Sequence, residues 1–339
     1  MGNLFPAVVR VSPSFIDPRL IIQQNQASGA FGLLAGGDLD VKLGQGDQYV
    51  YLKTLQIRTQ TAASQSAYNM LPSASLFAKE ISTPTYLMRV RAEYDHHDIA
   101  AAGNWGVGLP AAQSLGMRQA HFQQARNALL YGFNPQNGEG ILNTVGATAV
   151  NLPADSNGNT TTQTYDNGQM AFFLLQQVQA LKTRMFQMGM PLRIEILGPQ
   201  RILGPMEYQN IVQLTQFQRT GAGTASTKEL IQQVLSGKGD ELGWSYDDTL
   251  IGKGAGGADA VLIVAPEIDV PSVSGVNTNA FGGLQPNMAA CTVQYADMGA
   301  PREIPTPLAG GAIDVLSEWR ITSGWVPRPE AVTIVSMTY

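Results

Sequence analysis

The sequence predicts an α+β fold, and two kinds of periodic pattern carry this prediction. Alternating apolar and polar residues, typical of strands, occur at 49–61, 83–94 and 313–321. Between the second and third of these lie two long segments with helical spacing of apolar residues, at 110–131 and 168–188. Strands and helices that come in blocks, without an internal repeat, are typical of the α+β class. A chain of 339 residues is long enough for a large core divided between two lobes.

The composition predicts a weakly charged surface. Charged residues make up 14% of the chain, whereas hydrophobic residues reach an ordinary 44%. An ordinary soluble domain has about 25% charged residues. Because the cores of subunit interfaces are depleted in charge, this composition favours extensive contacts between subunits over a monomer with a neutral surface. The net charge is −5, and residues 195–310 hold the acidic excess.

Cys291 is the only cysteine, which excludes an intrachain disulfide and a cysteine-based metal site. No apolar run approaches the roughly 20 residues that a membrane-spanning helix needs. The first residues lack the apolar core of a secretory signal peptide. We therefore expect a protein that is made and used without secretion and without a membrane.

Residues 1–48 are expected to form an arm that packs on a neighbouring subunit. Prolines at positions 6, 13 and 18 interrupt helical periodicity, yet the segment is too apolar for a solvated tail. Contact with another subunit explains both properties. The apolar residues that we expect to make this contact are Leu4, Phe5, Phe15 and Ile16.

The alternating segments 49–61 and 83–94 flank a polar stretch of low complexity and predict a long two-stranded hairpin. An isolated two-stranded ribbon is only marginally stable in water. The hairpin is therefore expected to lie on another subunit.

The segment 110–131 predicts a helix of roughly 33 Å. Pro110 suits the first helical turn, and Gly132 ends the helix. The helix contains no acidic residue, and its only charges are Arg118 and Arg126. Its expected contact face is a narrow apolar seam of Ala111, Leu115, Phe122, Ala125, Ala128 and Leu129.

The second helix, at 168–188, has a broad apolar stripe and is expected to be buried on one face. Ser226 and Glu229 form a capping-box pattern that opens a further helix, which ends at Leu235. A loop and a helix around 206–215 are expected before it. Short strands are predicted at 192–197, 244–251, 261–264, 291–295 and 331–337.

No motif in the sequence indicates an enzyme. His96 and His97 are neighbours on a predicted strand end, so their side chains point to opposite faces and do not favour a metal site. The glycine-rich segment 252–257 lacks the context of a phosphate-binding loop and is interpreted as a surface loop. The acidic pairs at 240–241 and 247–248 are interpreted as solvated. We expect no catalytic residue, cofactor or metal.

The order of these elements resembles the major capsid protein of tailed bacteriophages, with the Hong Kong 97-type fold. The most specific similarity covers STPTYLMRVRAEYDHHDIAAAGNWG, the following helix, and YGFNPQNGEGILN. The resemblance implies an N-terminal arm, an extended β-hairpin loop, a peripheral domain with a long spine helix, and an axial domain. These parts would comprise 1–48 as the arm, 49–94 as the extended loop, 95–194 and 311–339 as the peripheral domain with its spine helix at 110–131, and 195–310 as the axial domain.

The resemblance implies self-assembly into pentamers and hexamers that form an icosahedral shell around double-stranded DNA. It implies a virion protein, assembled in the cytoplasm of the host bacterium, with a portal and possible decoration proteins as partners. The family often carries a charged N-terminal scaffolding segment, and none precedes the arm here, so we expect a separate scaffolding protein. The spine helix of the family lies toward the shell interior. The resulting candidates for non-specific contact with DNA are Arg89, Arg91, Arg118 and Arg126.

Several alternatives stay open at the level of sequence. The four arginines are equally compatible with ion pairs to acids of neighbouring subunits. An encapsulin-like nanocompartment shares the fold but encloses a cargo enzyme. Alternatives from other classes are a non-capsid binding or decoration protein, and a hydrolase that uses Asp and His near residues 95–98. Some relatives cross-link subunits through a lysine of the extended loop, but no pattern marks Lys53 or Lys79 for this chemistry.

Overall fold

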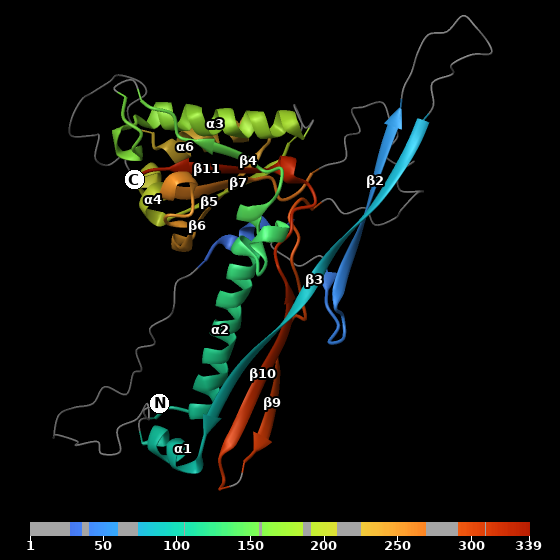
Figure 1. Ribbon diagram of the computed structural model, residues 1–339. Helices are drawn as coiled ribbons and strands as arrows, with labels where there is room; N and C mark the ends of the chain where they lie inside the picture. The colour runs from blue at the N-terminus through green and yellow to red at the C-terminus, as the bar shows by residue number, and fades with distance from the viewer. Residues whose placement is uncertain are drawn as a thin grey trace, which may run out of the picture.

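The computed structural model describes residues 28–35, 41–59, 74–104, 106–155, 158–185, 191–208, 225–268, 291–308 and 310–339. These residues form an upper lobe of helices and strands and an elongated lower part, from which a two-stranded ribbon projects (Figure 1). Helices and strands occur in both parts, and the predicted α+β class is confirmed.

The lower part is organised by a six-stranded sheet with the order β1-β8-β10-β3-β2, and β9 pairs with β10 beside this path. Its strands are β1 (Val41–Lys42), β2 (Tyr49–Thr59), β3 (Ala74–Tyr94), β8 (Ala296–Asp297), β9 (Arg302–Pro307) and β10 (Ile313–Thr322).

Strand β3 is 21 residues long and changes its partner half-way. Its first half pairs with β2, from Thr59↔Ala74 to Tyr49↔Pro84. Its second half, from Thr85 onward, pairs with β10. The prediction that 49–61 pairs with 83–94 is therefore wrong, because the second predicted strand belongs to the body of the sheet. The hairpin exists, but its second strand starts earlier than the alternation indicated.

Helix α2 (Leu109–Tyr131) lies along β3 and β10 (Figure 1), and α1 (His96–Gly103) precedes it. The predicted helix at 110–131 is confirmed. Proline occupies its first turn, and Gly132 ends it with a positive φ of 67°. A side chain at Gly132 would be strained in this conformation, which explains a helix stop at glycine.

The expected apolar seam of α2 is only partly correct. Leu129 is fully buried, but Leu115 is 48% and Phe122 41% exposed. The face that packs on the sheet instead contains Met117 and His121. The Nε2 atom of this histidine lies 2.9 Å from Ser317 Oγ on β10. This hydrogen bond lets a polar side chain occupy the buried face, which an apolar pattern alone does not predict.

The upper lobe contains a five-stranded sheet with the order β4-β11-β7-β5-β6. Three helices, α3, α4 and α6, accompany this sheet (Figure 1). The helices and strands are α3 (Asn167–Arg184), α4 (Gln200–Tyr208), α6 (Thr227–Ser236), β4 (Thr148–Asn151), β5 (Arg193–Gly198), β6 (Glu241–Tyr246), β7 (Asp259–Val264) and β11 (Val332–Met337).

The central strand β7 has every residue buried, and its side chains alternate between two cores. Val261 and Ile263 pack with α3, α4 and α6, whereas Leu262 and Val264 pack with the upper end of α2 and with η1 (Ala30–Leu33). The second core therefore joins the upper lobe to the lower part. The capping box predicted at Ser226 is confirmed, with the Ser226 hydroxyl accepting from Glu229 N and the Glu229 carboxylate from Ser226 N.

The structure groups the elements differently from the expected lobe boundaries. Helix α3 and strand β11, which we expected beside α2, lie in the upper lobe, where β11 pairs with β4 and β7. Strand β9, expected in the upper lobe, pairs with β10 in the lower sheet. Pairing across long sequence separations decides these positions, and a division of the chain into contiguous segments does not capture it. Helix α4 begins before the helix expected around 206–215.

Candidate assembly surfaces

The ribbon formed by β2 and the first half of β3 is the first candidate assembly surface. Strand β2 pairs with β3 alone, so the outer edge of β2 has no neighbouring strand among the described residues. Tyr49, Tyr51 and Phe77 are 53%, 61% and 53% exposed. The rings of the two tyrosines lie 6.2 Å apart, on one face of the ribbon. Aromatic side chains exposed on a thin ribbon are the type of surface that another polypeptide covers.

The outward face of α2 is the second candidate surface. It carries the partly exposed Leu115 and Phe122, together with Arg118, whose side chain is 67% exposed. The Phe122 ring contacts one aromatic residue of another segment, Phe31, at a centroid distance of 5.4 Å. This face therefore combines apolar area with one accessible positive charge.

Two of the four candidate arginines, Arg89 and Arg91, are paired with acids of the same chain. Arg89 Nε lies 2.9 Å from Glu318 Oε1. Arg91 bridges Asp314 at 2.7 Å and Glu93 at 3.2 Å. Acids of the same chain therefore already neutralise Arg89 and Arg91, without partners from neighbouring subunits. Exposed pairs of this kind contribute about 0–1 kcal/mol each, so they balance charge more than they stabilise the fold.

Arg118 and Arg126 differ from these pairs and from each other. Arg118 Nε lies 3.8 Å from Glu303 Oε1, beyond hydrogen-bond range. Glu303 accepts a hydrogen bond from Ser114 at 2.6 Å instead. Arg126 is buried, with 8% of its surface exposed. The expectation that Arg126 faces packaged DNA is not supported by this position, because its side chain does not reach the surface.

A buried polar junction joins the end of α2, the ribbon-bearing strand β3 and the end of β10. Glu139 accepts hydrogen bonds from Tyr86 OH at 2.9 and 3.0 Å, from Ser323 Oγ at 2.6 Å and from Asn134 N at 3.0 Å. Burial, and then the bond to Glu139, raise the pKa of Tyr86 to about 12. The carboxylate therefore holds three segments together at the base of the ribbon.

The backbone at this junction is packed too closely for side chains. Gly140 N donates to Gly324 O at 2.8 Å, and Gly324 N donates to Ala128 O at 2.9 Å. A Cβ atom on Gly140 would lie 2.5 Å from Gly132 N. The passage NGEGILN is therefore the point where the end of α2 meets the rest of the molecule. The role of Glu139 within it has no signal in the sequence.

Solved structures share this arrangement over nearly the whole chain. The capsid of Myoviridae Phage XM1 matches with a TM-score of 0.67 and 11% identity, with 96% of each chain covered. The capsid of Cyanophage P-SCSP1u matches with a TM-score of 0.58 and 10% identity, over 95% of this chain and 92% of that chain. The capsid of a native GTA particle matches with a TM-score of 0.58 and 8% identity, over 97% and 96%. This chain has the Hong Kong 97-type capsid fold. No family model and no curated protein sequence matches it.

The helix that we expected as the spine helix is α2, and the hairpin that we expected as the extended loop is the β2–β3 ribbon. The candidate arm residues Leu4, Phe5, Phe15 and Ile16 lie outside the described residues. The described chain contains no helix with the length and apolar content of a membrane span.

Two acidic residues of the upper lobe, Asp240 and Asp247, are buried and accept hydrogen bonds. Our interpretation of them as solvated is therefore wrong. Asp240 is 5% exposed and accepts from Lys182 Nζ at 2.6 Å. Asp247 is 1% exposed and accepts from Thr249 N at 2.9 Å and from the hydroxyl of Ser28. Lys182 and Ser28, which donate to Asp240 and Asp247, are distant in the sequence, so sequence neighbours do not reveal these donors.

The residues around the two adjacent histidines begin a helix and do not end a strand. Asp95 caps α1, accepting from Asp98 N at 2.8 Å, while Asp98 accepts from Asp95 N at 3.2 Å. Both carboxylates are thus engaged with the backbone. Within the described ranges, no group of three or more metal-ligand side chains comes together.

The glycine-rich segment 252–257 is a surface loop, as expected, with most of its residues exposed. It follows the short helical turn η6 (Asp248–Leu250), contains the short turn η7 (Ala255–Gly257) and leads into β7, so no α-helix begins at it. Lys253 Nζ lies 5.5 Å from the centre of the Tyr131 ring. This contact accounts for the lysine without a phosphate ligand.

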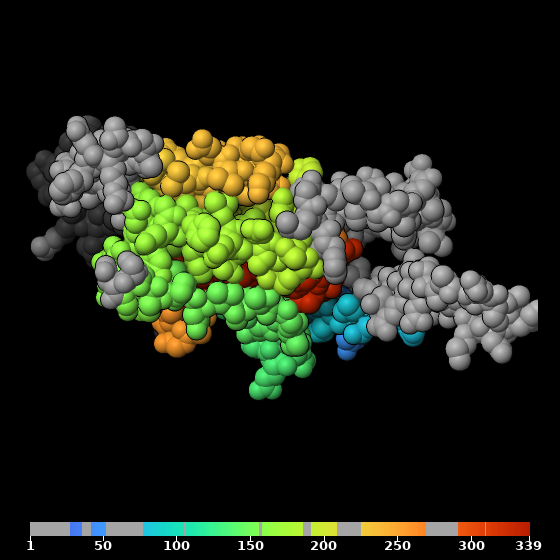
Figure 2. Space-filling view, turned by 90° about the horizontal axis from the view of Figure 1, so that it is seen from above, coloured from blue at the N-terminus to red at the C-terminus, as the bar shows by residue number. Residues whose placement is uncertain are grey.

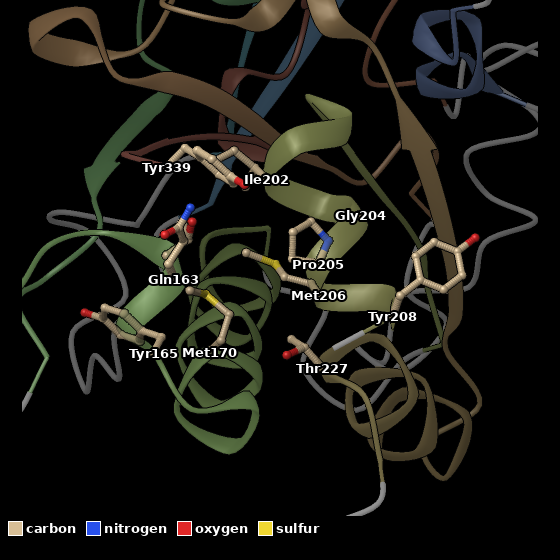
Figure 3. A pocket seen from close by; sticks show the side chains of 11 residues that line it. Gln163, Tyr165, Met170, Ile202, Gly204, Pro205, Met206, Tyr208, Thr227 and Tyr339 are labelled. Atoms are coloured by element: carbon tan, nitrogen blue, oxygen red, sulfur yellow. The ribbon is translucent and has the colours of Figure 1, made fainter. Parts of the chain in front are cut away.

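A cavity of about 410 Å³ lies in the upper lobe between α3, α4 and the start of α6. Figure 3 shows the side chains of Met170 and Met206 close to each other in the cavity, and Tyr339 at its edge. The described residues that line it include no carboxylate, histidine, lysine or arginine. The cavity is therefore lined mainly by apolar, aromatic and uncharged polar side chains.

Proposed function

We propose that this chain is a major capsid protein, which assembles into pentamers and hexamers that close into an icosahedral shell around the double-stranded DNA of a tailed phage. The observation that carries the proposal is the ribbon, an extended two-stranded element that exposes aromatic side chains and whose strand β2 pairs with β3 alone among the described residues. The capsid fold supports the same function. The ribbon gains its stability when it lies across a neighbouring subunit.

The proposed shell depends on repeated contacts between copies of this chain. The arm residues Leu4, Phe5, Phe15 and Ile16 contact a neighbouring subunit, and the upper lobes surround the pentamer and hexamer axes. A separate scaffolding protein and a portal act during assembly in the host cytoplasm, and decoration proteins bind the finished virion. The chain has a structural role and performs no catalysis. The area that each subunit buries far exceeds the roughly 1,600 Å² of a standard interface.

Negative-stain microscopy of the purified protein, with size-exclusion chromatography and light scattering, tests this function. Wild-type protein is expected to form closed shells or rings of five and six subunits. The double variant Tyr49→Asp and Tyr51→Asp is expected to stay in solution as folded subunits, because two carboxylates on the ribbon would have to be buried without partners. The side-chain change itself is tolerated in the subunit, since both tyrosines are more than half exposed.

Val145→Asp provides the matched control. Val145 is 82% exposed and belongs to neither strand of the ribbon, so this variant is expected to assemble like wild type. Wild-type protein that remains monomeric in all assembly conditions would contradict the capsid function. Shells formed equally well by the ribbon variant would contradict the role of the ribbon.

We further propose that the outward face of α2 lies toward the shell interior, and that Arg118 contacts DNA without reading its sequence. Arg118 supports this proposal best among the four arginines, because its side chain is 67% exposed and 3.8 Å from the nearest carboxylate. Arg89 and Arg91 lie on the same part of the lower sheet, but carboxylates at 2.9 and 2.7 Å neutralise them. Their contribution to DNA contact is therefore smaller.

Binding of the purified subunit to random-sequence duplex DNA at several salt concentrations tests the role of Arg118. Each phosphate contact contributes about 0.9 to the slope of log affinity against log salt. Arg118→Ala is expected to reduce the slope by about that amount. Arg91→Ala is the control and is expected to leave the slope nearly unchanged. Equal slopes for wild type and Arg118→Ala would rule out this contact.

A further inference from the structure

Helix α2 carries an apolar stripe that the described chain covers only at its upper end. Leu115, Phe122 and Leu129 are seven residues apart and therefore lie along one side of the helix. Leu129 is fully buried, Phe122 is 41% exposed, and Leu115 is 48% exposed. The stripe thus becomes more exposed with distance from the upper lobe, over about 21 Å of helix.

The segment that covers the stripe is the one that leads to the N-terminus. Leu33 of η1 packs in the same core as Leu129. Phe31, two residues closer to the N-terminus, lies against Phe122 with ring centroids 5.4 Å apart and against Tyr295 at 6.0 Å. Within η1, Phe31 therefore contacts α2 at a lower level than Leu129.

The two residues directly before η1, Ser28 and Gly29, are fixed by hydrogen bonds to the upper lobe. Gly29 N donates to Tyr246 O at 3.0 Å, and the Ser28 hydroxyl donates to Asp247. Residues 1–27, which lie outside the described residues, therefore begin from an anchored point beside the upper end of the stripe. Leu115 lies about 10.5 Å below Phe122 along the helix. Six residues lead from the anchored Ser28 back to Ile22 and reach about 20 Å in extended form, so residues as far back as Ile22 can cover Leu115.

The composition of the N-terminal segment fits an apolar surface. Residues 1–27 contain three charged side chains, Arg10, Asp17 and Arg19, and the apolar run Leu20-Ile21-Ile22 comes last before the polar residues that join η1. Pro13 and Pro18 disfavour a helix in the part before this run. We infer that Leu20, Ile21 and Ile22 of the same chain cover the Leu115–Phe122 part of α2.

This contact lies within one chain and does not rest on the proposed shell function. It divides the first 27 residues into two parts. The part nearest η1 fastens the arm to its own spine helix, and the part before Arg19 stays available to a neighbouring subunit. The arm would then leave each subunit from a defined place at the lower end of α2 and not from η1.

Cross-linking between introduced cysteines tests the inference in the full-length chain. Cys291→Ser removes the only natural cysteine, and the test pair is Ile22→Cys with Leu115→Cys. A short bismaleimide is expected to link this pair within one chain at least fivefold more efficiently than Ile22→Cys with Val145→Cys. The second pair is the control, because Val145 is 82% exposed and lies outside α2. Peptide mass spectrometry identifies the product.

A mixture of ¹⁴N- and ¹⁵N-labelled protein distinguishes the source of the segment. Cross-linked peptides in which both halves carry the same isotope label support a contact within one chain. Mixed-label peptides would assign the stripe to the arm of a second copy and overturn the inference. Equal yields for the test and control pairs would also overturn it.

A single-cysteine measurement covers the case in which the double variant does not fold. The variant Leu115→Cys with Cys291→Ser changes one half-exposed helix position and one buried thiol. Its reaction with a maleimide is expected to be at least tenfold slower in the full chain than in a chain that lacks residues 1–26. Equal rates in the two chains would show that the segment does not cover Leu115.

Discussion

Replacement of Gly140 by alanine is expected to lower the free energy of unfolding of the subunit by about 3 kcal/mol or more. Gly140 has a φ of 86°, in which an alanine is strained by about 1 kcal/mol. Its Cβ would also lie 2.5 Å from Gly132 N and 2.7 Å from Tyr131 O. Both atoms belong to the backbone at the end of α2, so no side chain can move aside. Relief requires separation of the GILN passage from the helix.

Substitutions at two further glycines separate the cost of the positive φ from the cost of the close backbone contact. Gly138 has a φ of 75°, but no atom would lie closer to its Cβ than the tip of Val145, at 3.3 Å, so Gly138→Ala is expected to cost about 1 kcal/mol. Gly116 lies inside α2 with nothing within 4 Å of a Cβ, and Gly116→Ala is expected to stabilise by up to about 1 kcal/mol. Urea denaturation of the unassembled subunit measures all three. A cost for Gly140→Ala no larger than that for Gly138→Ala would contradict close packing at the junction.

The position of this junction shows what local sequence can predict. Pro110 and Gly132 mark the two ends of α2 because each acts through its own backbone geometry. Ser226 and Glu229 mark the start of α6 for the same reason, since a capping box needs only residues three apart. The helix boundaries can therefore be predicted from the sequence. The packing of Gly140 against the end of the helix cannot be predicted from it, because this contact depends on where the chain turns after Gly138.

The sequence predicts the positions of strands better than it predicts which strands pair with each other. The two halves of β3 both alternate, yet one half lies on the ribbon and the other in the body of the sheet. Alternation reports that a residue faces one side of a sheet, and it does not report which strand is adjacent. For this reason the partner of Tyr49–Thr59 was misassigned although both strands were expected.

The burial of a charged side chain is the feature of the candidate site that the sequence predicts least well. The four arginines were selected from their places on α2 and β3, and Arg89, Arg91 and Arg118 do lie on the surface. Arg126 does not, because α2 enters the upper lobe at that level and neighbouring segments surround it. The depth of a residue along a helix relative to the lobe boundary depends on tertiary packing, which the helical pattern does not contain.

Removal of the carboxylate of Asp240 is the second change with a large expected effect. Its side chain is 1% exposed, and that of its partner Lys182 is 9% exposed. Lys182 Nζ lies 2.6 Å from both carboxylate oxygens, and Leu192 N donates to Oδ1 at 2.8 Å. The pair lies where the end of α3 meets the turn between α6 and β6, and Figure 2 shows α3 and α6 side by side on this face.

Asp240→Ala is expected to destabilise the subunit by about 3–5 kcal/mol, because the Lys182 ammonium loses its carboxylate and Leu192 N loses its acceptor. The double variant Lys182→Met with Asp240→Ala is expected to recover at least about 1 kcal/mol relative to the single variant, since no buried charge is left without its counterion. Arg89→Met breaks an exposed pair with Glu318 and serves as the control, with an expected cost below about 1 kcal/mol. Denaturation midpoints of the four proteins give these differences. If the double variant is no more stable than Asp240→Ala, the cost comes from the lost backbone acceptor and not from the ammonium.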